Sequence, residues 1–228
     1  MGTDEPAPAE LERPGLAELH AEMRACCRCL EAGHSITPGA VFSGPPSARI
    51  MLVGQAPGES EVRARRPFNG SAGRRLFEWL SEAGWTEHAF RRTEYISAMT
   101  KCYPGKAASG RGDRAPSRAE QRLCAPFLER ELALVRPGIV IPVGALAVRH
   151  FLGPAKLGAV VGQVYRRDER WVIPLPHPSG ANLWLNRAEN QELVRQALGH
   201  IARQSRLLGL PAGRCGQAAS PSVEGTGK

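Results

Sequence analysis

Six cysteines are the residues of this 228-residue chain whose spacing points most directly to chemistry. Cys26 and Cys29 form a C-x-x-C pair, and Cys102 and Cys124 lie far along the chain. Structural disulfides are rare in the cytoplasm, so such a set more often binds a metal or supplies a reactive thiol. Four thiolates can hold either zinc or an iron-sulfur cluster. Buried free thiols are the structural alternative.

A stretch rich in glycine and charge, VGQAPGESEVRARRPFNGSAG at residues 53–73, is the second candidate for chemistry. Its glycines let the backbone turn sharply and approach a ligand closely. Gln55 offers an amide and Phe68 an aromatic ring, the groups that read a flat heterocycle by hydrogen bonding and by stacking. The stretch lacks the spacing of a P-loop or a Rossmann fingerprint. A structural loop whose Phe68 fills the core is the alternative.

Strands and helices alternate around these candidates. Four short apolar runs predict buried strands at residues 49–54, 94–100, 138–144 and 171–176. Amphipathic patterns predict helices at residues 15–29, 71–84, 117–135, 145–153 and 189–208. This order is typical of an α/β layered fold with a mainly parallel sheet. Ligands bind at the carboxyl ends of strands in such folds, which favours the loops at residues 53–73, 100–106 and 176–184.

The charge balance favours an anionic partner such as DNA. The chain carries 30 Lys and Arg against 22 Asp and Glu, a formal net charge of +8, and arginine forks match phosphate oxygens. An arginine-rich composition can equally reflect a GC-rich genome. Five basic residues lie in an insertion that could track phosphates or could be a plain solvated loop: Lys106, Arg111, Arg114, Arg118 and Arg122.

Two ends without periodicity flank an organised middle. Residues 1–12 and 211–228 are rich in small residues and proline, and we expect disordered tails around one domain at residues 13–210. No apolar run reaches the roughly 18 to 20 residues of a membrane helix, and the N-terminus lacks a secretory signal pattern. We therefore expect a cytoplasmic protein with no membrane partner.

Residues 53–73 resemble motif one of the iron-sulfur uracil-DNA glycosylases, whose pattern reads roughly G-E-A-P-G-x-x-E-D-x-x-G-R-P-F-V-G-x-A-G. The matching residues are Gly54, Ala56, Pro57, Gly58, Glu61, Arg66, Pro67, Phe68, Gly70, Ala72 and Gly73. Three further family features follow in order: the C-x-x-C pair, the KCYP segment at 101–104, and a cysteine before PFL at 126–128. With HPS at 177–179, the resemblance covers residues 20–205 and indicates a divergent member of the family four or five branch.

This resemblance implies a fold, a cofactor and an activity. The family has a three-layer α/β/α fold with a central four-stranded, mainly parallel sheet, which agrees with the number of strands predicted above. Its members are DNA repair enzymes that hydrolyse the N-glycosidic bond of a damaged base. By resemblance a 4Fe-4S cluster is held by Cys26, Cys29, Cys102 and Cys124, with Cys27 and Cys215 spare. We expect a monomer that binds DNA.

The resemblance also assigns roles within the two motifs. Release of the base as an anion, through an oxocarbenium-like state, requires charge stabilisation in a site closed to water. His177 takes the place of the histidine that donates to the uracil O2 as negative charge develops. Phe68 would stack on the flipped base. Pro178, Ser179 and Gly180 would form the loop that presses into the DNA minor groove.

Two positions beside the base depart from the family pattern. Gln55 stands next to Ala56 where the family usually has glutamate, and an amide cannot act as a general base. Glu61 and Glu59 are the nearest carboxylates in sequence for the attacking water, with ion pairs to nearby arginines as the alternative. Ala98 replaces the family's asparagine, which hydrogen-bonds the uracil edge. A site that lacks this contact loses discrimination or moves to another base, so we expect uracil or another deaminated base as the substrate.

Two other functions stay open from the sequence. The polar groups lost at positions 55 and 98 also fit a catalytically inactive DNA- or lesion-binding homologue with a structural iron-sulfur cluster. An α/β protein that is stabilised by a structural zinc ion and has no role on DNA is the other possibility.

Overall fold

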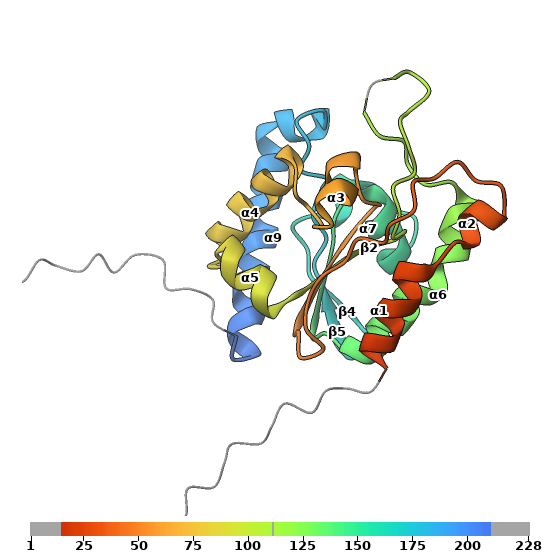
Figure 1. Ribbon diagram of the computed structural model, residues 1–228. Helices are drawn as coiled ribbons and strands as arrows, with labels where there is room; N and C mark the ends of the chain where they lie inside the picture. The colour runs from red at the N-terminus through yellow and green to blue at the C-terminus, as the bar shows by residue number, and fades with distance from the viewer. Residues whose placement is uncertain (1–14, 111, 211–228) are drawn as a thin grey trace, which may run out of the picture.

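A five-stranded sheet forms the centre of the computed structural model, which describes residues 15–110 and 112–210 (Figure 1). The strands are β1 Ile50–Gly54, β2 Tyr95–Ala98, β3 Ile139–Pro142, β4 Tyr165–Arg167 and β5 Arg170–Val172. Their order is β2-β1-β3-β5-β4, with all neighbours parallel except the antiparallel pair of β4 and β5. The predicted α/β/α class with a mainly parallel sheet is therefore confirmed. The tails expected at residues 1–12 and 211–228 lie outside the described residues.

The sequence predicts four strands, and the structure adds β4 as a fifth. This strand has three residues, none of them buried, and it forms a hairpin with β5. Asp168 in the turn has a φ of 51°, a left-handed conformation that Asp tolerates. A short polar edge strand leaves no apolar run, so the hydrophobic pattern could not reveal it.

Helices cover both faces of the sheet, and within the described residues they are α1 Leu16–Ala25, α2 Arg28–Glu31, α3 Glu59–Ala64, α4 Ser71–Glu82, α5 Glu87–Thr93, α6 Arg118–Val135, α7 Ala145–Leu152, α8 Leu157–Val160, the 3-10 helix η1 Leu183–Asn186, and α9 Ala188–Leu207. All five predicted helices are present. The first is divided, because Cys26 adopts an extended backbone conformation that ends α1 before α2 begins. No helix among the described residues is long and apolar enough to span a bilayer.

The core consists of two layers, one on each face of the sheet. Ile50 and Leu52 pack with residues of α4, α5 and α9, whereas Met51 and Val53 pack with residues of α1, α6 and α7. Figure 1 shows α4, α5 and α9 on one side and α1 and α6 on the other. Both faces of β1 are thus buried, which explains its continuous apolar run. The carboxyl ends of β1, β2 and β3 lie at one edge of this sandwich.

Candidate active site and cysteine cavity

A cavity of about 600 Å³ lies at the carboxyl ends of the parallel strands, within the roughly 300 to 1,000 Å³ typical of ligand pockets. The chain segments after β1, β2 and β5 all contribute to its wall. Seven of the residues predicted for the site line it: Gln55, Ala56, Glu61, Phe68, Ala98, His177 and Ser179. Residues far apart in sequence therefore meet in one place, as the parallel topology predicts.

The Phe68 ring lies over the end of β1, and its backbone has a φ of 51°. A Cβ on Gly54 would lie 3.0 Å from the ring, so this glycine allows the close approach. The guanidinium of Arg91 donates to the carbonyl oxygens of Pro67 and Phe68 at 2.8 and 2.9 Å. Phe68 is partly buried against the core, so the ring is held from behind while it borders the cavity.

Gly73 is required for this placement of Phe68. A Cβ at position 73 would lie 1.9 Å from the Phe68 carbonyl oxygen, an overlap with backbone that no rotamer relieves. We expect Gly73→Ala to lower the free energy of unfolding by about 1–3 kcal/mol in chemical denaturation. The matched control is Gly199→Ala in α9, where a Cβ meets open space and a small stabilisation of about 0.5–1 kcal/mol is expected. Equal stabilities of the two variants would show that Gly73 is not required for the placement of Phe68.

His177 is held as a neutral imidazole with its proton on Nε2. Burial lowers the pKa of His177 below its ordinary value, so the ring is uncharged at neutral pH. The Ser179 backbone N–H donates to Nδ1 at 3.3 Å, which leaves the ring proton on Nε2. The Asn182 side chain donates to the His177 carbonyl at 2.8 Å. A Cβ on Gly144 would lie 3.4 Å from the His177 Cβ, so His177 packs closely over the end of β3.

The loop after His177 leads to an exposed residue that is not among those predicted to contact DNA. Pro178 is buried, Ser179 is half-buried and Gly180 is exposed. Leu183, just beyond them, is 75% exposed and is one of three exposed large apolar side chains among the described residues. Trp184 instead packs against the core. The predicted contacts of Pro178, Ser179 and Gly180 with DNA stay predictions. Leu183 was not predicted, because an isolated leucine in a sequence usually indicates a buried core residue.

Glu61 braces the loop at residues 53–73. Its Oε2 accepts the Gly58 N–H at 2.5 Å, and the backbone groups of Phe68 and Asn69 also donate to the carboxylate. Burial raises the pKa of Glu61, and these three hydrogen bonds act in the opposite direction. The contacts favour a positioning role, and activation of water by Glu61 stays a prediction. Glu59 forms ion pairs instead, with Arg63 at 3.3 Å and Lys106 at 3.0 Å.

The insertion after β2 folds back and brings a second carboxylate to the cavity. Asp113 lines the wall, and its Oδ1 accepts from the Tyr103 hydroxyl at 2.8 Å and from Lys106 at 3.2 Å. A Cβ on Gly58 would lie 3.0 Å from Asp113 Oδ2, so this oxygen faces the first loop. Sequence reasoning missed Asp113, because no pattern shows where an insertion folds back.

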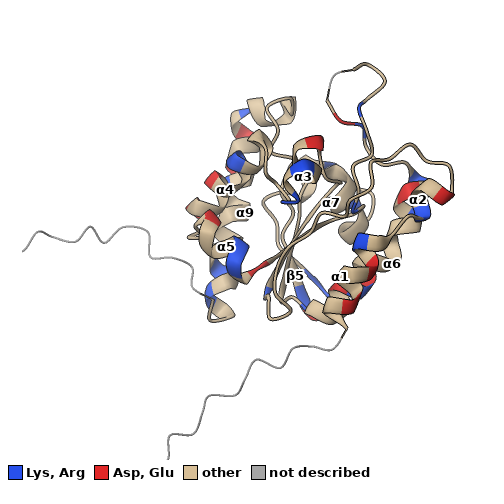
Figure 2. Ribbon diagram, viewed as in Figure 1, with Lys and Arg blue, Asp and Glu red and all other residues tan. Residues whose placement is uncertain are grey.

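Two of the basic residues in this insertion are engaged in ion pairs. Lys106 bridges Glu59 and Asp113. Arg114 pairs with Glu120 at 2.6 Å and holds the pKa of that carboxyl down at about 2. Figure 2 shows basic and acidic residues interspersed over the helices in this view. On the side seen in Figure 2, charge alone therefore does not mark a DNA-binding face, and a phosphate-tracking role for the insertion stays a prediction.

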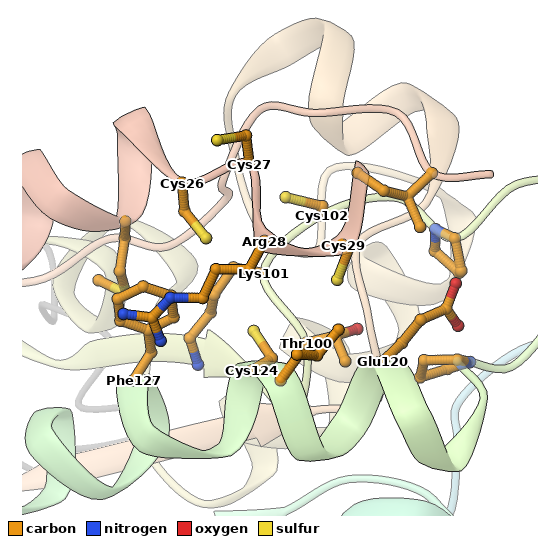
Figure 3. A pocket seen from close by; sticks show the side chains of 15 residues that line it. Cys26, Cys27, Arg28, Cys29, Thr100, Lys101, Cys102, Glu120, Cys124 and Phe127 are labelled. Atoms are coloured by element: carbon orange, nitrogen blue, oxygen red, sulfur yellow. The ribbon is translucent and has the colours of Figure 1, made fainter. Parts of the chain in front are cut away.

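Four predicted ligands surround a second cavity. Cys26 follows α1, Cys29 lies on α2, Cys102 follows β2 and Cys124 lies on α6, and all four line the same space (Figure 3). Cys27 also borders it, but this thiol is exposed and donates to Glu31 at 2.9 Å. Cys215 lies outside the described residues. The structure thus brings together the four cysteines that the resemblance selects.

Burial and backbone hydrogen bonds act in opposite directions on two of these thiols. Burial raises the pKa of Cys102 to about 11 and also raises the pKa of Cys124. Backbone groups oppose this effect, since Gly39 donates to Cys102 and Lys101 donates to Cys124, which favours the thiolates. Within residues 15–110 and 112–210, no three His, Cys, Asp or Glu side chains converge tightly enough to hold a metal ion. A four-iron cluster does not require such convergence, because each thiolate binds a separate iron.

A buried ion pair connects the cysteine cavity with the end of β2. The Lys101 ammonium lies 2.7 Å from Glu131 and donates to the Ser97 hydroxyl and to the Ala98 carbonyl at 2.9 and 2.6 Å. The side chains of Lys101 and Glu131 are 3% and 0% exposed. Tyr95 also donates to Glu131, at 3.1 Å. The backbone beside the first cavity is therefore fixed in part by Lys101, which borders the second.

Comparison with known proteins gives consistent matches. The pattern of the Uracil DNA glycosylase superfamily matches residues 41–201. A Type-4 uracil-DNA glycosylase of Thermotoga maritima is 32% identical over 197 residues, which cover 84% of this chain and 94% of that protein. A Type-4 enzyme of Pyrobaculum aerophilum is 34% identical over 66% of this chain and 74% of its own. A Type-5 uracil-DNA glycosylase of the same organism is 30% identical over 71% and 73%.

Proposed function

The chain belongs to the uracil-DNA glycosylase superfamily, and from this premise we propose that it is a DNA repair glycosylase. It hydrolyses the N-glycosidic bond of uracil or another deaminated base in DNA and acts as a monomer. One observation carries the proposal: the Phe68 ring and an uncharged His177 with its proton on Nε2 line a single cavity.

The two side chains have complementary tasks in base release. The flipped base stacks on Phe68, and His177 Nε2–H donates to the base oxygen on which negative charge develops. A fixed, neutral donor in a site with little water stabilises that charge without reorganisation. Leu183, exposed at the start of η1 directly after the same loop, is suited to wedge between base steps while the nucleotide is flipped, together with the loop of Pro178, Ser179 and Gly180.

Recognition of the base edge falls to Gln55. Ala98 offers no side-chain hydrogen bond, and the neighbouring Ser97 hydroxyl is already engaged with Glu131 and Lys101. The Gln55 amide carries both donors and an acceptor, and it borders the cavity beside Ala56. A single amide can turn either group toward the base, so this pocket is suited to more than one deaminated base.

The carboxylate that orients the attacking water can be identified by mutation. Glu61 and Asp113 are the carboxylates in the described wall of the cavity, and the Glu61 carboxylate is already engaged by backbone N–H groups. We expect Asp113→Asn to slow single-turnover base release by about 10²-fold. Asp168→Asn, in the exposed turn between β4 and β5, is the control. If Glu61→Gln has this effect instead and Asp113→Asn has none, Glu61 holds the water.

The cofactor proposed for the second cavity is a 4Fe-4S cluster on Cys26, Cys29, Cys102 and Cys124. The donor set and the N–H groups directed at Cys102 and Cys124 support it. When bound, the cluster joins α1, α2, α6 and the end of β2 and so stabilises the fold. Iron, sulfide and zinc analysis of the purified protein decides between the cluster and zinc.

A substrate panel tests the proposed activity. Single- and double-stranded oligonucleotides that contain uracil, hypoxanthine or xanthine are incubated with metal-loaded protein, and alkali then cleaves any abasic sites. We expect cleavage at one or more of these bases. Binding of all the oligonucleotides without any cleavage would instead support the inactive lesion-binding homologue.

A further inference from the structure

We propose that the Thr100 hydroxyl donates a hydrogen bond to a sulfur atom of the iron-sulfur cluster held by the four cysteines. The inference rests on the cofactor proposed above. Thr100 directly precedes Lys101 and Cys102, and it borders the same cavity as the cysteines (Figure 3). It is therefore placed to contact whatever fills that cavity.

The Thr100 hydroxyl has no partner in the structure although it is buried. The residue is 6% exposed, and Oγ1 is one of two buried side-chain N and O atoms without a hydrogen bond among the described residues. The other, Gln204 Oε1, lies on α9, away from this cavity. Buried hydroxyls are nearly always hydrogen-bonded, because an unmade bond costs free energy. An acceptor for Thr100 is therefore to be expected inside the cavity.

Nearby polar groups are already engaged. The Lys101 ammonium points to Glu131, Ser97 and Ala98. Glu120, the carboxylate on the cavity wall, accepts from Arg114 and from the Ser117 N–H. Apart from Glu120, the side-chain acceptors among the described residues that line the cavity are sulfur atoms, those of Met23 and of the cysteines.

Sulfur is the acceptor that fits this position. Backbone N–H groups already donate to Cys102 and Cys124, and the Thr100 hydroxyl adds a side-chain donor on the same wall. Hydrogen bonds to the sulfurs of a cluster withdraw charge from the iron-sulfur bonds and tune the metal site. Thr100 is thus a positioning and tuning residue, and the variant Thr100→Val keeps its shape but removes the donor.

Resonance Raman spectroscopy of the iron-sulfur stretches tests the inference in the full-length, cluster-loaded protein. Exchange from H2O into D2O shifts stretches of hydrogen-bonded sulfurs. We expect a smaller shift in Thr100→Val than in wild type, and a shift like wild type in Thr100→Ser. The control is Thr93→Val, since the Thr93 hydroxyl bonds to Ala89 and Glu94 at the end of α5. Iron and sulfide content is measured for each variant.

The outcomes separate this inference from the proposed cofactor. Brown, iron-loaded protein whose D2O shift is unchanged by Thr100→Val overturns the hydrogen bond and leaves the cluster in place. Colourless protein that contains zinc and no sulfide overturns both. A reduced shift in Thr100→Val that Thr100→Ser restores supports both.

Discussion

Replacement of His177 by alanine is expected to slow base release by about 10²- to 10³-fold, the usual cost of removing a donor aimed at developing negative charge. The fold should survive, because His177 lies in a loop beyond the sheet and its backbone carbonyl still accepts from Asn182. Single-turnover release from a uracil-containing oligonucleotide measures the effect. His88→Ala, exposed on α5, is the control and should match wild type. A His177→Ala variant with wild-type rates would show that His177 does not stabilise the leaving base.

The same histidine makes stability depend on pH in a defined direction. Burial lowers the folded-state pKa of His177 below the unfolded value of about 6.5. The neutral form is therefore favoured by folding, and its contribution to stability is fully present above the unfolded pKa. It is lost as the pH falls through the lower, folded pKa. Wild type should consequently lose more stability than His177→Ala between neutral and acidic pH in chemical denaturation.

Replacement of Glu131 by leucine is expected to cost about 3–5 kcal/mol of the free energy of unfolding, because it leaves a buried ammonium without its counter-ion. The Lys101 side chain is only 3% exposed. Tyr95 and Ser97 would also lose the acceptor that they share. Urea denaturation measures the change, with Glu129→Leu on the exposed face of the same helix as the control.

A double variant distinguishes the effect of an unpaired buried charge on stability from the effect of lost packing. Lys101→Met with Glu131→Leu removes both charges, and most of the lost stability should return, since apolar pairs of similar volume often replace buried ion pairs at little cost. A double variant as unstable as Glu131→Leu alone would show that the uncompensated charge is not the cause. The double variant should still release bases more slowly, because the Ala98 carbonyl loses the ammonium that holds it.

The sequence predicts the parts of this fold whose burial is continuous. All five residues of β1 are buried, and both β1 and β3 appear in the sequence as uninterrupted apolar runs. The edge strand β4 has no buried residue and leaves no such signal. The break between α1 and α2 depends on the backbone conformation of Cys26. An amphipathic pattern that runs across a cysteine-rich turn cannot predict that break.

The residues of the candidate site also include some that the sequence indicates and some that it does not. Phe68 and the cysteines stand out by residue type and spacing, whereas His177 is assigned by the family resemblance. The structure places Phe68 and His177 on one cavity and the four cysteines on the other, and their roles stay predictions. Asp113 could not be predicted, since its position depends on contacts of the insertion with Tyr103 and Lys106. The unpartnered hydroxyl of Thr100 is visible only once the cavity is formed.

The products formed from a uracil-containing strand show whether the protein hydrolyses the N-glycosidic bond with His177 as the donor to the leaving base. The metal content of the protein is determined first. The protein is then incubated with a duplex whose uracil is radiolabelled, and free base is separated from DNA before any alkali is added. We expect free uracil, a strand that stays intact until alkali is added, and breakage at that position afterwards. Release of uracil and breakage after alkali should both be strongly reduced in His177→Ala. Strand breakage before alkali, or release of uracil at the wild-type rate by His177→Ala, would contradict this mechanism.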